Sequence, residues 1–195
     1  MKSFLKLKQI DKKFFGYEDI ARIFNISLDS ARVESSRFVK YGLIVRIKRN
    51  LYVLNDNLSH FTIEELFSLS NLLQVPSYVS LISALSYYGI TTQIQQGFFE
   101  CICTKRTKEV HVKDFVFNYT KIKKDLYFGF IKKHNFFIAE PEKAFLDAVY
   151  LSTIGRYSFD RTSIDTKKLN HNKLKKILKR FPNKVKSEIH KYGFA

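Results

Sequence analysis

Apolar residues recur with a helical period in the first 24 residues of the chain. They lie three or four residues apart at Phe4, Leu7, Ile10 and Phe14, a spacing that predicts one face of a helix with Ser3 as its N-cap. Gly16 ends this pattern. A second helix is predicted over residues 17–24, where two acidic residues suit the positive N-terminal end of a helix.

A third helical pattern follows after a short turn. Ser27 is its expected N-cap, and the helix is predicted to continue to Tyr41. Gly42 then ends it, because glycine readily adopts the left-handed conformation found after helices. The inward face consists of the residues at spacing i, i+4, i+7 and i+8, which are Ala31, Ser35, Phe38 and Val39.

Two short β-runs, LIVRI and LYVL, follow this helix and are joined by the basic turn KRN. Three helices and a hairpin in this order are typical of a winged helix-turn-helix, in which a short turn fixes the crossing of the second and third helices. We therefore expect residues 1–57 to form a DNA-binding domain of this kind. A protein-docking role for the same module is the alternative.

The third helix of such a module enters the major groove with its N-terminal residues leading. Arg32 is the best candidate to read a base edge, and Val33 is suited to contact a thymine methyl group. The other outward residues are suited to phosphate contacts, which fix the register on DNA. The expected DNA-binding residues are Ser30, Arg32, Val33, Ser36, Arg37 and Lys40 on the helix, and Arg46, Lys48, Arg49 and Asn50 on the hairpin.

Residues 58–195 combine helical and strand-like patterns, which predict a second domain with an α+β fold. Residues 62–73 and 77–89 have helical patterns, and Ser77 is the expected N-cap of the second helix. Four strand-like runs follow, GFFECICT, DFVFNYTKI, LYFGFIKK and NFFIA, whose short connections favour an antiparallel or mixed sheet. The run EPEKAFLDAVYL then predicts a helix with Pro141 in its first turn.

Basic residues are concentrated at the two ends of the chain, whose formal net charge is +16. The net charge is +7 for residues 1–54, +1 for residues 55–157 and +8 for residues 158–195. A polyanion is therefore expected to contact the two ends, whereas the middle serves another purpose.

The basic C-terminal end contains an amphipathic helical pattern in the run NKLKKILKRF. Its apolar positions, expected to pack on the domain, are Leu174, Ile177, Leu178 and Phe181. Its basic positions are Lys173, Lys175, Lys176, Lys179 and Arg180. These five residues form either a solvated charged face or a second polyanion contact. A membrane-interface helix is disfavoured, because large apolar anchors are few.

Sequence patterns of common enzymes are absent: the chain has no Gly-rich phosphate loop, no GxSxG and no HExxH. One suggestive group is Glu140, Glu142, Lys143 and Asp147. Lys143 and Asp147 are four residues apart on the predicted helix, so we expect them to pair across its surface. We expect no enzymatic activity, no metal and no cofactor; a nucleic-acid-processing enzyme that uses these carboxylates is the alternative.

Cys101 and Cys103 alternate with other residues in a strand-like run. Both thiols should point to one face of the strand, with poor geometry for a mutual disulfide, and we expect them to be buried and reduced. No apolar run approaches the ~20 residues needed to span a bilayer. The N-terminal run lacks the apolar region of a signal peptide, so we expect a cytoplasmic protein with no membrane partner.

After the basic N-terminal module, the chain contains PSYVSLISALSYYGITTQI, then CTKR, then AEPEKAFLDAVY. Together these motifs resemble the AbiEi family, the antitoxins and transcriptional regulators of abortive-infection toxin–antitoxin operons. The family elements YVSLxSAL and PEKAxLD correspond to residues 78–85 and 141–147. The resemblance implies that a winged helix binds inverted repeats in the operon's own promoter. It also implies that the C-terminal domain counteracts a nucleotidyltransferase-like toxin, in the type IV manner that does not require direct binding; sequestration of the toxin by direct binding is the alternative.

Overall fold

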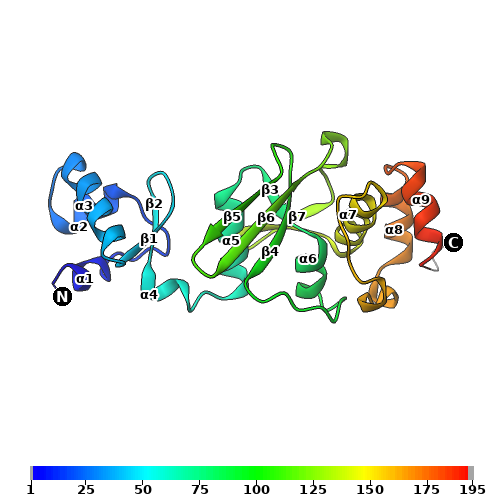
Figure 1. The fold of residues 1–195 in the computed structure, drawn as a ribbon, viewed down its shortest axis with the longest axis horizontal. Helices are drawn as coiled ribbons and strands as arrows, with labels where there is room; N and C mark the ends of the chain where they lie inside the picture. Colours follow the sequence, from blue (N-terminus) through cyan, green and yellow to red (C-terminus); the bar gives the residue numbers. More distant parts are fainter. Residues whose placement is uncertain (1, 193–195) are drawn as a thin grey trace. The chain divides into compact units, whose positions relative to one another are not determined.

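The computed structural model describes residues 2–192 of the chain and has a mixed α+β fold (Figure 1). The chain divides into two compact units, Met1–Ile63 and Glu64–Ala195. The sequence pattern predicts a boundary after residue 57. No helix in the described part of the chain has the length and apolar character that crossing a membrane requires.

The N-terminal unit contains short helices followed by a hairpin (Figure 1). Its elements are α1 (Lys2–Leu7), α2 (Tyr17–Phe24), α3 (Leu28–Lys40), β1 (Ile44–Lys48), β2 (Leu51–Leu54) and α4 (Asn55–Leu58). The predicted second and third helices and the antiparallel hairpin are confirmed. Gly42 has the expected left-handed φ of 68° after α3.

The first helix is shorter than its apolar pattern predicts. It ends at Leu7, and Ser3 lies inside it, so the predicted N-cap is wrong. The chain leaves the helix because Phe15 pairs with the hairpin: its N–H donates to the Tyr52 carbonyl oxygen at 3.0 Å, and the Tyr52 N–H donates back at 2.8 Å. The apolar residues still reach the core, since Leu7 and Ile10 are both buried.

One hydrophobic core joins the helices of this unit to its hairpin. Ala31 and Phe38 of α3 pack there with Ile20 of α2 and Ile44 of β1. Ser35 is buried on the same face of α3, and its hydroxyl lies 3.2 Å from the Tyr52 hydroxyl. The inward face of the third helix is therefore as predicted for these three residues, and Val39 packs against the core while partly buried.

A six-stranded mixed sheet forms the centre of the C-terminal unit (Figure 1). Its strands, in the order β5-β6-β4-β3-β8-β7, are β3 (Ser77–Val79), β4 (Phe98–Cys103), β5 (Lys108–Val112), β6 (Phe115–Lys121), β7 (Phe130–Lys133) and β8 (Phe136–Ala139). Strand β3 runs parallel to β8, and β4 runs parallel to β6. Of the two arrangements that the sequence favours, antiparallel or mixed, the mixed sheet is therefore the one observed.

The rest of the C-terminal unit consists mainly of helices and short 3-10 turns. The helices are α5 (Ile63–Leu73), α6 (Leu81–Tyr87), α7 (Pro141–Thr153), α8 (His171–Leu178) and α9 (Asn183–His190), and the turns are η1 (Lys124–Leu126), η2 (Arg161–Ser163) and η3 (Thr166–Lys168). Helix α7 begins at Pro141, as predicted, and packs against α6, α8 and α9. Ten consecutive residues of α7, from Glu142 to Leu151, are buried, so it is a central helix with no solvated face along this stretch.

The helix predicted from Ser77 is wrong in its first turn. Ser77, Tyr78 and Val79 form β3, which lies between β4 and β8, and the helix begins only at Leu81. Pairing with two strands satisfies the backbone of this segment on both sides, and that tertiary pairing outweighs the local helical signal. Leu81 has a φ of 54°, which turns the chain from strand to helix.

Candidate nucleic-acid interface

The start of α3 is fixed by local hydrogen bonds. The Ser27 hydroxyl oxygen accepts a bond from the Ser30 N–H at 3.2 Å and donates to the Ser30 hydroxyl at 2.9 Å. Ser27 is thus the N-cap that the sequence predicts. Asn25 ends α2 in the left-handed conformation, with a φ of 55°, which sets the short turn between the two helices.

The outward face of α3 carries the six residues expected to contact DNA. All of them are exposed: Ser30, Arg32, Val33, Ser36, Arg37 and Lys40. Their exposure follows from the burial of the opposite face, because residues at a helical period alternate between core and solvent. The structure therefore places these side chains on one accessible helix face.

Both arginines on this face have acidic neighbours one turn away. The Arg32 guanidinium donates to Asp29 at 3.2 Å and to the Tyr17 hydroxyl at 3.3 Å, and it stacks 4.8 Å from the centre of the Tyr17 ring. Arg37 donates to Glu34 at 2.6 Å. Exposed pairs of this kind contribute between about 0 and 1 kcal/mol, so they leave the arginines able to exchange partners. The two acids do reduce the positive potential of the face.

Tyr17 is the residue of this surface that the sequence pattern misses. It is the first residue of α2, and its ring and hydroxyl both contact Arg32 on α3. Nothing in the local sequence signals this contact, because it depends on how the two helices cross. Tyr17 orients the guanidinium and restricts its rotamers.

The hairpin adds basic residues beside α3. Arg46, Lys48 and Arg49 are exposed, and Arg46 and Arg49 have no ion-pair partner within residues 2–192. Asn50 differs from the expectation, because its side chain is engaged within the unit. Its carbonyl oxygen accepts the Tyr17 N–H at 2.7 Å, and its amide donates to Glu18 at 2.8 Å. Asn50 thus supports the hairpin tip, and its contact with DNA stays a prediction.

The basic residues of α8 and of its C-terminal end divide into two groups. Lys175, Lys176 and Lys179 are exposed and have no acidic partner in the described part of the chain. Lys173 instead pairs with Glu140 at 2.6 Å and is 3.7 Å from Glu142, and the hydrogen bond to Glu140 raises its pKa. Lys173 is therefore partly neutralised in the unit, and its contact with a polyanion stays a prediction.

Arg180 is held against η1 and the residues that follow it. Its guanidinium lies 3.5 Å from the centre of the Phe128 ring and donates to the Asp125 carbonyl oxygen at 3.2 Å. Leu174 and Phe181 are buried, as the amphipathic pattern predicts, and fasten α8 to the unit.

Lys143 and Asp147 of α7 form an ion pair that is completely buried, so the expected surface pair is wrong. Asp147 also accepts hydrogen bonds from the hydroxyls of Tyr78 and Ser80, both at 2.9 Å. Burial lowers the pKa of Lys143 and raises the pKa of Asp147, whereas their mutual attraction opposes both shifts. The pair lies inside the unit because α6, α8 and α9 surround α7.

A second buried carboxyl group belongs to Glu100 of β4. It accepts the Ile82 N–H at 3.0 Å and the Tyr157 hydroxyl at 3.1 Å. Burial raises its pKa to about 7, and these hydrogen bonds act in the opposite direction. The neighbouring Cys101 and Cys103 are buried free thiols, as expected.

Within residues 2–192, no three His, Cys, Asp or Glu side chains are grouped so that they could hold a metal ion. No protein-family model matches the chain, and a search of curated proteins finds no significant match.

Proposed function

We propose that the N-terminal unit is a winged helix-turn-helix that binds duplex DNA, and that the protein is an autorepressor and antitoxin of a toxin–antitoxin operon. The observation that carries the DNA-binding part is the accessible face of α3, with Arg32, Arg37 and Lys40, beside a hairpin with exposed arginines. Helix α3 has 13 residues and is therefore about 20 Å long, a size suited to the major groove.

In this proposal, the residues of the face have different roles. Arg32 reads a base edge, and its contact with Tyr17 holds the guanidinium in position before DNA binds. Arg37 and Lys40 contact phosphates and fix the register of α3 in the groove. Arg46 and Arg49 on the hairpin contact the adjoining backbone or minor groove. Because Asp29 and Glu34 lie on the same helix, we expect modest affinity from a single module.

The antitoxin part of the proposal rests on the resemblance of residues 78–85 and 141–147 to AbiEi motifs. These two segments are joined by hydrogen bonds from Tyr78 and Ser80 to Asp147, all of which are buried. The motifs therefore support a fold of the C-terminal unit like that of the AbiEi family. The surface that would counteract a nucleotidyltransferase-like toxin lies outside these buried residues.

A second candidate function is sequestration of the toxin by direct binding. The observation that favours it is a set of large apolar side chains exposed on and after α3: Leu28 is 50%, Val33 53% and Tyr41 71% exposed. Exposed apolar residues near charged ones are common at protein interfaces. Co-purification of the untagged chain with the product of a neighbouring gene would support this function over the first.

Binding to the DNA upstream of the chain's own reading frame tests the proposal. We expect Arg32→Ala to weaken binding about 10-fold or more and to relax sequence preference, since one base-reading arginine contributes about 1–3 kcal/mol. Arg37→Ala should weaken binding to all duplexes alike. Lys167→Gln/Lys184→Gln is a matched control, because it removes two exposed charges of the C-terminal unit. Unchanged binding by an Arg32→Ala/Arg37→Ala variant with an intact fold would refute the placement of α3.

A further inference from the structure

Basic residues of the middle of the chain gather at one end of the C-terminal sheet, where several strands begin or stop. Strands β4 and β6 are parallel and in register, with Cys103 opposite Lys121, so both strands stop at this end. Strand β5 runs antiparallel to β6 and begins there. The turns after β4 and β6 are therefore neighbours. The two turns and the ends of the elements that flank them carry the residues that we call the cationic loops: Lys105, Arg106, Lys108, Lys121, Lys123 and Lys124.

Hydrogen bonds lock the cationic loops to one another. The Ile122 N–H donates to the Cys103 carbonyl oxygen at 2.9 Å, and the Lys121 N–H donates to the Thr107 hydroxyl at 3.0 Å. Arg156 bridges the two turns, because its guanidinium donates to the Lys121 carbonyl oxygen at 3.1 Å and to the Thr107 hydroxyl at 2.9 Å. The loops thus form a fixed surface, to which Arg156 adds a further positive charge.

In the described part of the chain, these charges are not paired with carboxylates, although Glu109 and Asp125 adjoin the loops in the sequence. Within residues 2–192, neither Arg156 nor any residue of the cationic loops forms an ion pair. The pKa of Lys108 is lowered, first by burial and then by the positive charges of Arg106 and Lys105. The Arg180 contact with the Asp125 carbonyl brings one more cation to the turn that follows Lys124.

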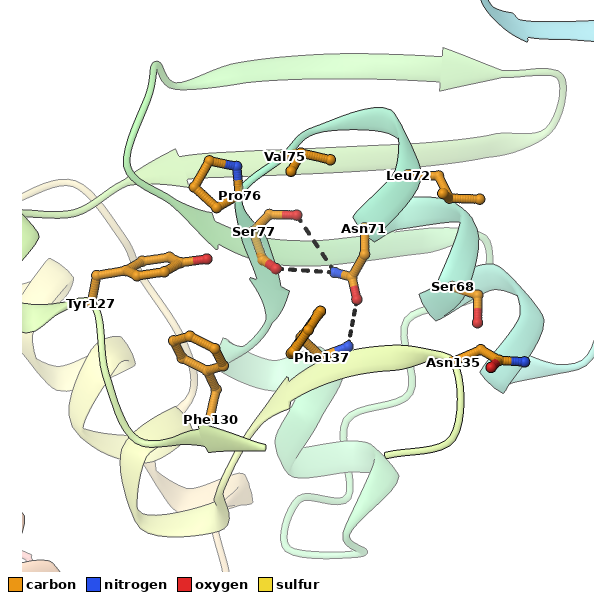
Figure 2. A pocket seen from close by; sticks show the side chains of 10 residues that line it. All are labelled: Ser68, Asn71, Leu72, Val75, Pro76, Ser77, Tyr127, Phe130, Asn135 and Phe137. Carbon is orange, nitrogen blue, oxygen red and sulfur yellow. Dashed lines mark hydrogen bonds between the residues drawn. The ribbon is translucent and has the colours of Figure 1, made fainter. Parts of the chain in front are cut away.

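An apolar pocket of about 360 Å³ lies in the same unit (Figure 2). Its walls include the aromatic rings of Tyr127, Phe130 and Phe137 and the side chains of Val75 and Pro76. This volume is within the range of ligand-binding pockets, which combine apolar walls with a few polar groups.

The polar groups of the pocket are held by Asn71 of α5. Its amide donates to the Ser77 carbonyl oxygen at 3.4 Å, and its side-chain oxygen accepts the Phe137 N–H at 2.6 Å (Figure 2). Asn71 thereby fixes the ends of β3 and β8 around the cavity. Phe137 is 41% exposed although it lines the pocket, so its ring is accessible to a ligand.

The pocket lies next to the cationic loops. Ser77 on its wall pairs with Cys103, the last residue before the first loop. On another wall, the Tyr127 N–H donates to the Lys124 carbonyl oxygen at 3.0 Å. Burial, together with the nearby Cys103, raises the pKa of Tyr127 to about 12, so its hydroxyl keeps its proton at neutral pH. The first cationic loop therefore begins beside Ser77 of the pocket, and the second ends beside Tyr127.

We infer that this pocket and the cationic loops form a binding site for single-stranded nucleic acid, in which a base enters the pocket and neighbouring phosphates lie on the loops. Aromatic side chains beside a cationic surface provide base stacking and phosphate contacts, the two interactions by which proteins hold single strands. A duplex cannot fill the pocket, since its bases are paired and stacked inside the helix. The site is therefore separate from the duplex-binding surface proposed for α3 and goes beyond that function.

Fluorescence anisotropy of the full chain with a labelled 12-nucleotide single strand, dT12 or U12, tests this inference. We expect Lys105→Gln/Lys123→Gln to weaken binding about 10-fold or more. The control Lys167→Gln/Lys184→Gln removes the same charge elsewhere in the unit and should change affinity less than about 2-fold. Phe137→Ala should weaken binding about 3-fold or more through lost stacking. Val75→Asp, at a position 57% exposed on the pocket wall, is a second pocket variant that perturbs the core little.

Each of the following results would contradict the inference. Equal losses for the two double-lysine variants would reveal general electrostatic attraction. Full binding by both pocket variants would exclude the pocket as the base site. Competition by poly-glutamate as strong as by an oligonucleotide of equal charge would indicate a surface for acidic proteins, and binding of free nucleotides as tight as that of the 12-mer would indicate a mononucleotide site.

Cross-linking separates this inference from the proposed function of α3. A single strand with 4-thiouridine should cross-link to the peptide that contains Tyr127 and Phe137, and cross-links confined to residues 28–50 would refute the pocket site. Duplex binding by the Lys105→Gln/Lys123→Gln variant should remain unchanged, whereas Arg32→Ala/Arg37→Ala should retain single-strand binding. The single-strand site and the duplex-binding surface of α3 can therefore be refuted independently of each other.

Discussion

The side-chain oxygen of Asn50, at the tip of the hairpin, accepts a hydrogen bond from the backbone N–H of Tyr17, the first residue of α2, at 2.7 Å. The N–H groups of a first helical turn lack partners within the helix, so this bond satisfies one of them from outside. Asn50 has a φ of 54°, a conformation that asparagine tolerates better than most residues. The hairpin tip is thus fixed to the start of α2, and with it the arginines expected to contact DNA.

Replacement of Asn50 tests this support. Asn50→Ala should destabilise the N-terminal unit by about 2–3 kcal/mol, because it removes the hydrogen bonds and places alanine at a left-handed φ. Asn50→Gly removes the same bonds without the conformational cost and should be milder. Hydrogen exchange of the peptide covering residues 16–24 is the measurement. Protection equal to that of the wild type in both variants would contradict a supporting role.

The buried pair on α7 predicts an asymmetric response to substitution. Lys143→Met leaves the Asp147 carboxylate buried without its cation and should cost about 3–5 kcal/mol. Adding Asp147→Leu removes the unpaired charge, so the double variant should regain part of this loss. Urea denaturation of both variants measures the difference. A double variant that is less stable than Lys143→Met would show that Asp147 has an independent stabilising role.

The buried carboxyl group of Glu100 predicts a pH dependence of stability. Because its pKa is raised to about 7 in the folded state from a usual value of 4.5, the folded chain binds this proton more tightly. The free energy of unfolding should therefore fall as the pH rises from about 4.5 to 7, by up to about 3 kcal/mol, and level off above that. Glu100→Gln should lose this slope and be more stable than the wild type at pH 8.

Urea denaturation between pH 4 and 8 provides the measurement. Asp114→Asn, at an exposed position of the turn between β5 and β6, is the matched control and should keep the wild-type slope. The same slope in Glu100→Gln as in the wild type would assign the pH dependence to another group.

The two thiols should be inert in the folded protein. Both are buried, and burial raises the pKa of Cys101 to about 12 and that of Cys103 above its usual value. The thiolate is the reactive form, so native protein at pH 8 should react slowly with a thiol reagent, and both thiols should react in guanidinium chloride. Rapid labelling of either cysteine without denaturant would mean that β4 opens readily.

Local signals predict the elements whose boundaries depend on nearby residues. Ser27 and Gly42 mark the two ends of α3, because caps act within one turn of the helix. The strand at residues 77–79 is missed, since it depends on partners in β4 and β8 far along the chain. Lys143 and Asp147 have the spacing of a surface pair, and only the packing around α7 buries them.

The cationic loops are missed for a related reason. Their charges are cancelled in the net charge of residues 55–157, because that sum includes acidic residues that form no ion pair with them in the described part of the chain. The lysine-rich turns TKRTK and KIKK are the local signal that could have indicated them. Their proximity follows only from the parallel pairing of β4 and β6.

The salt dependence of duplex binding is the most direct measurement of whether α3 and the hairpin hold DNA. Each phosphate contact adds about −0.9 to the slope of log K against log salt concentration. Arg46→Ala/Arg49→Ala should therefore make the slope of the full chain shallower by about 1.8, and Lys167→Gln/Lys184→Gln should leave it unchanged. An identical slope for the wild type and the hairpin variant, or no measurable duplex binding by the wild type at low salt, would contradict a DNA-binding N-terminal unit.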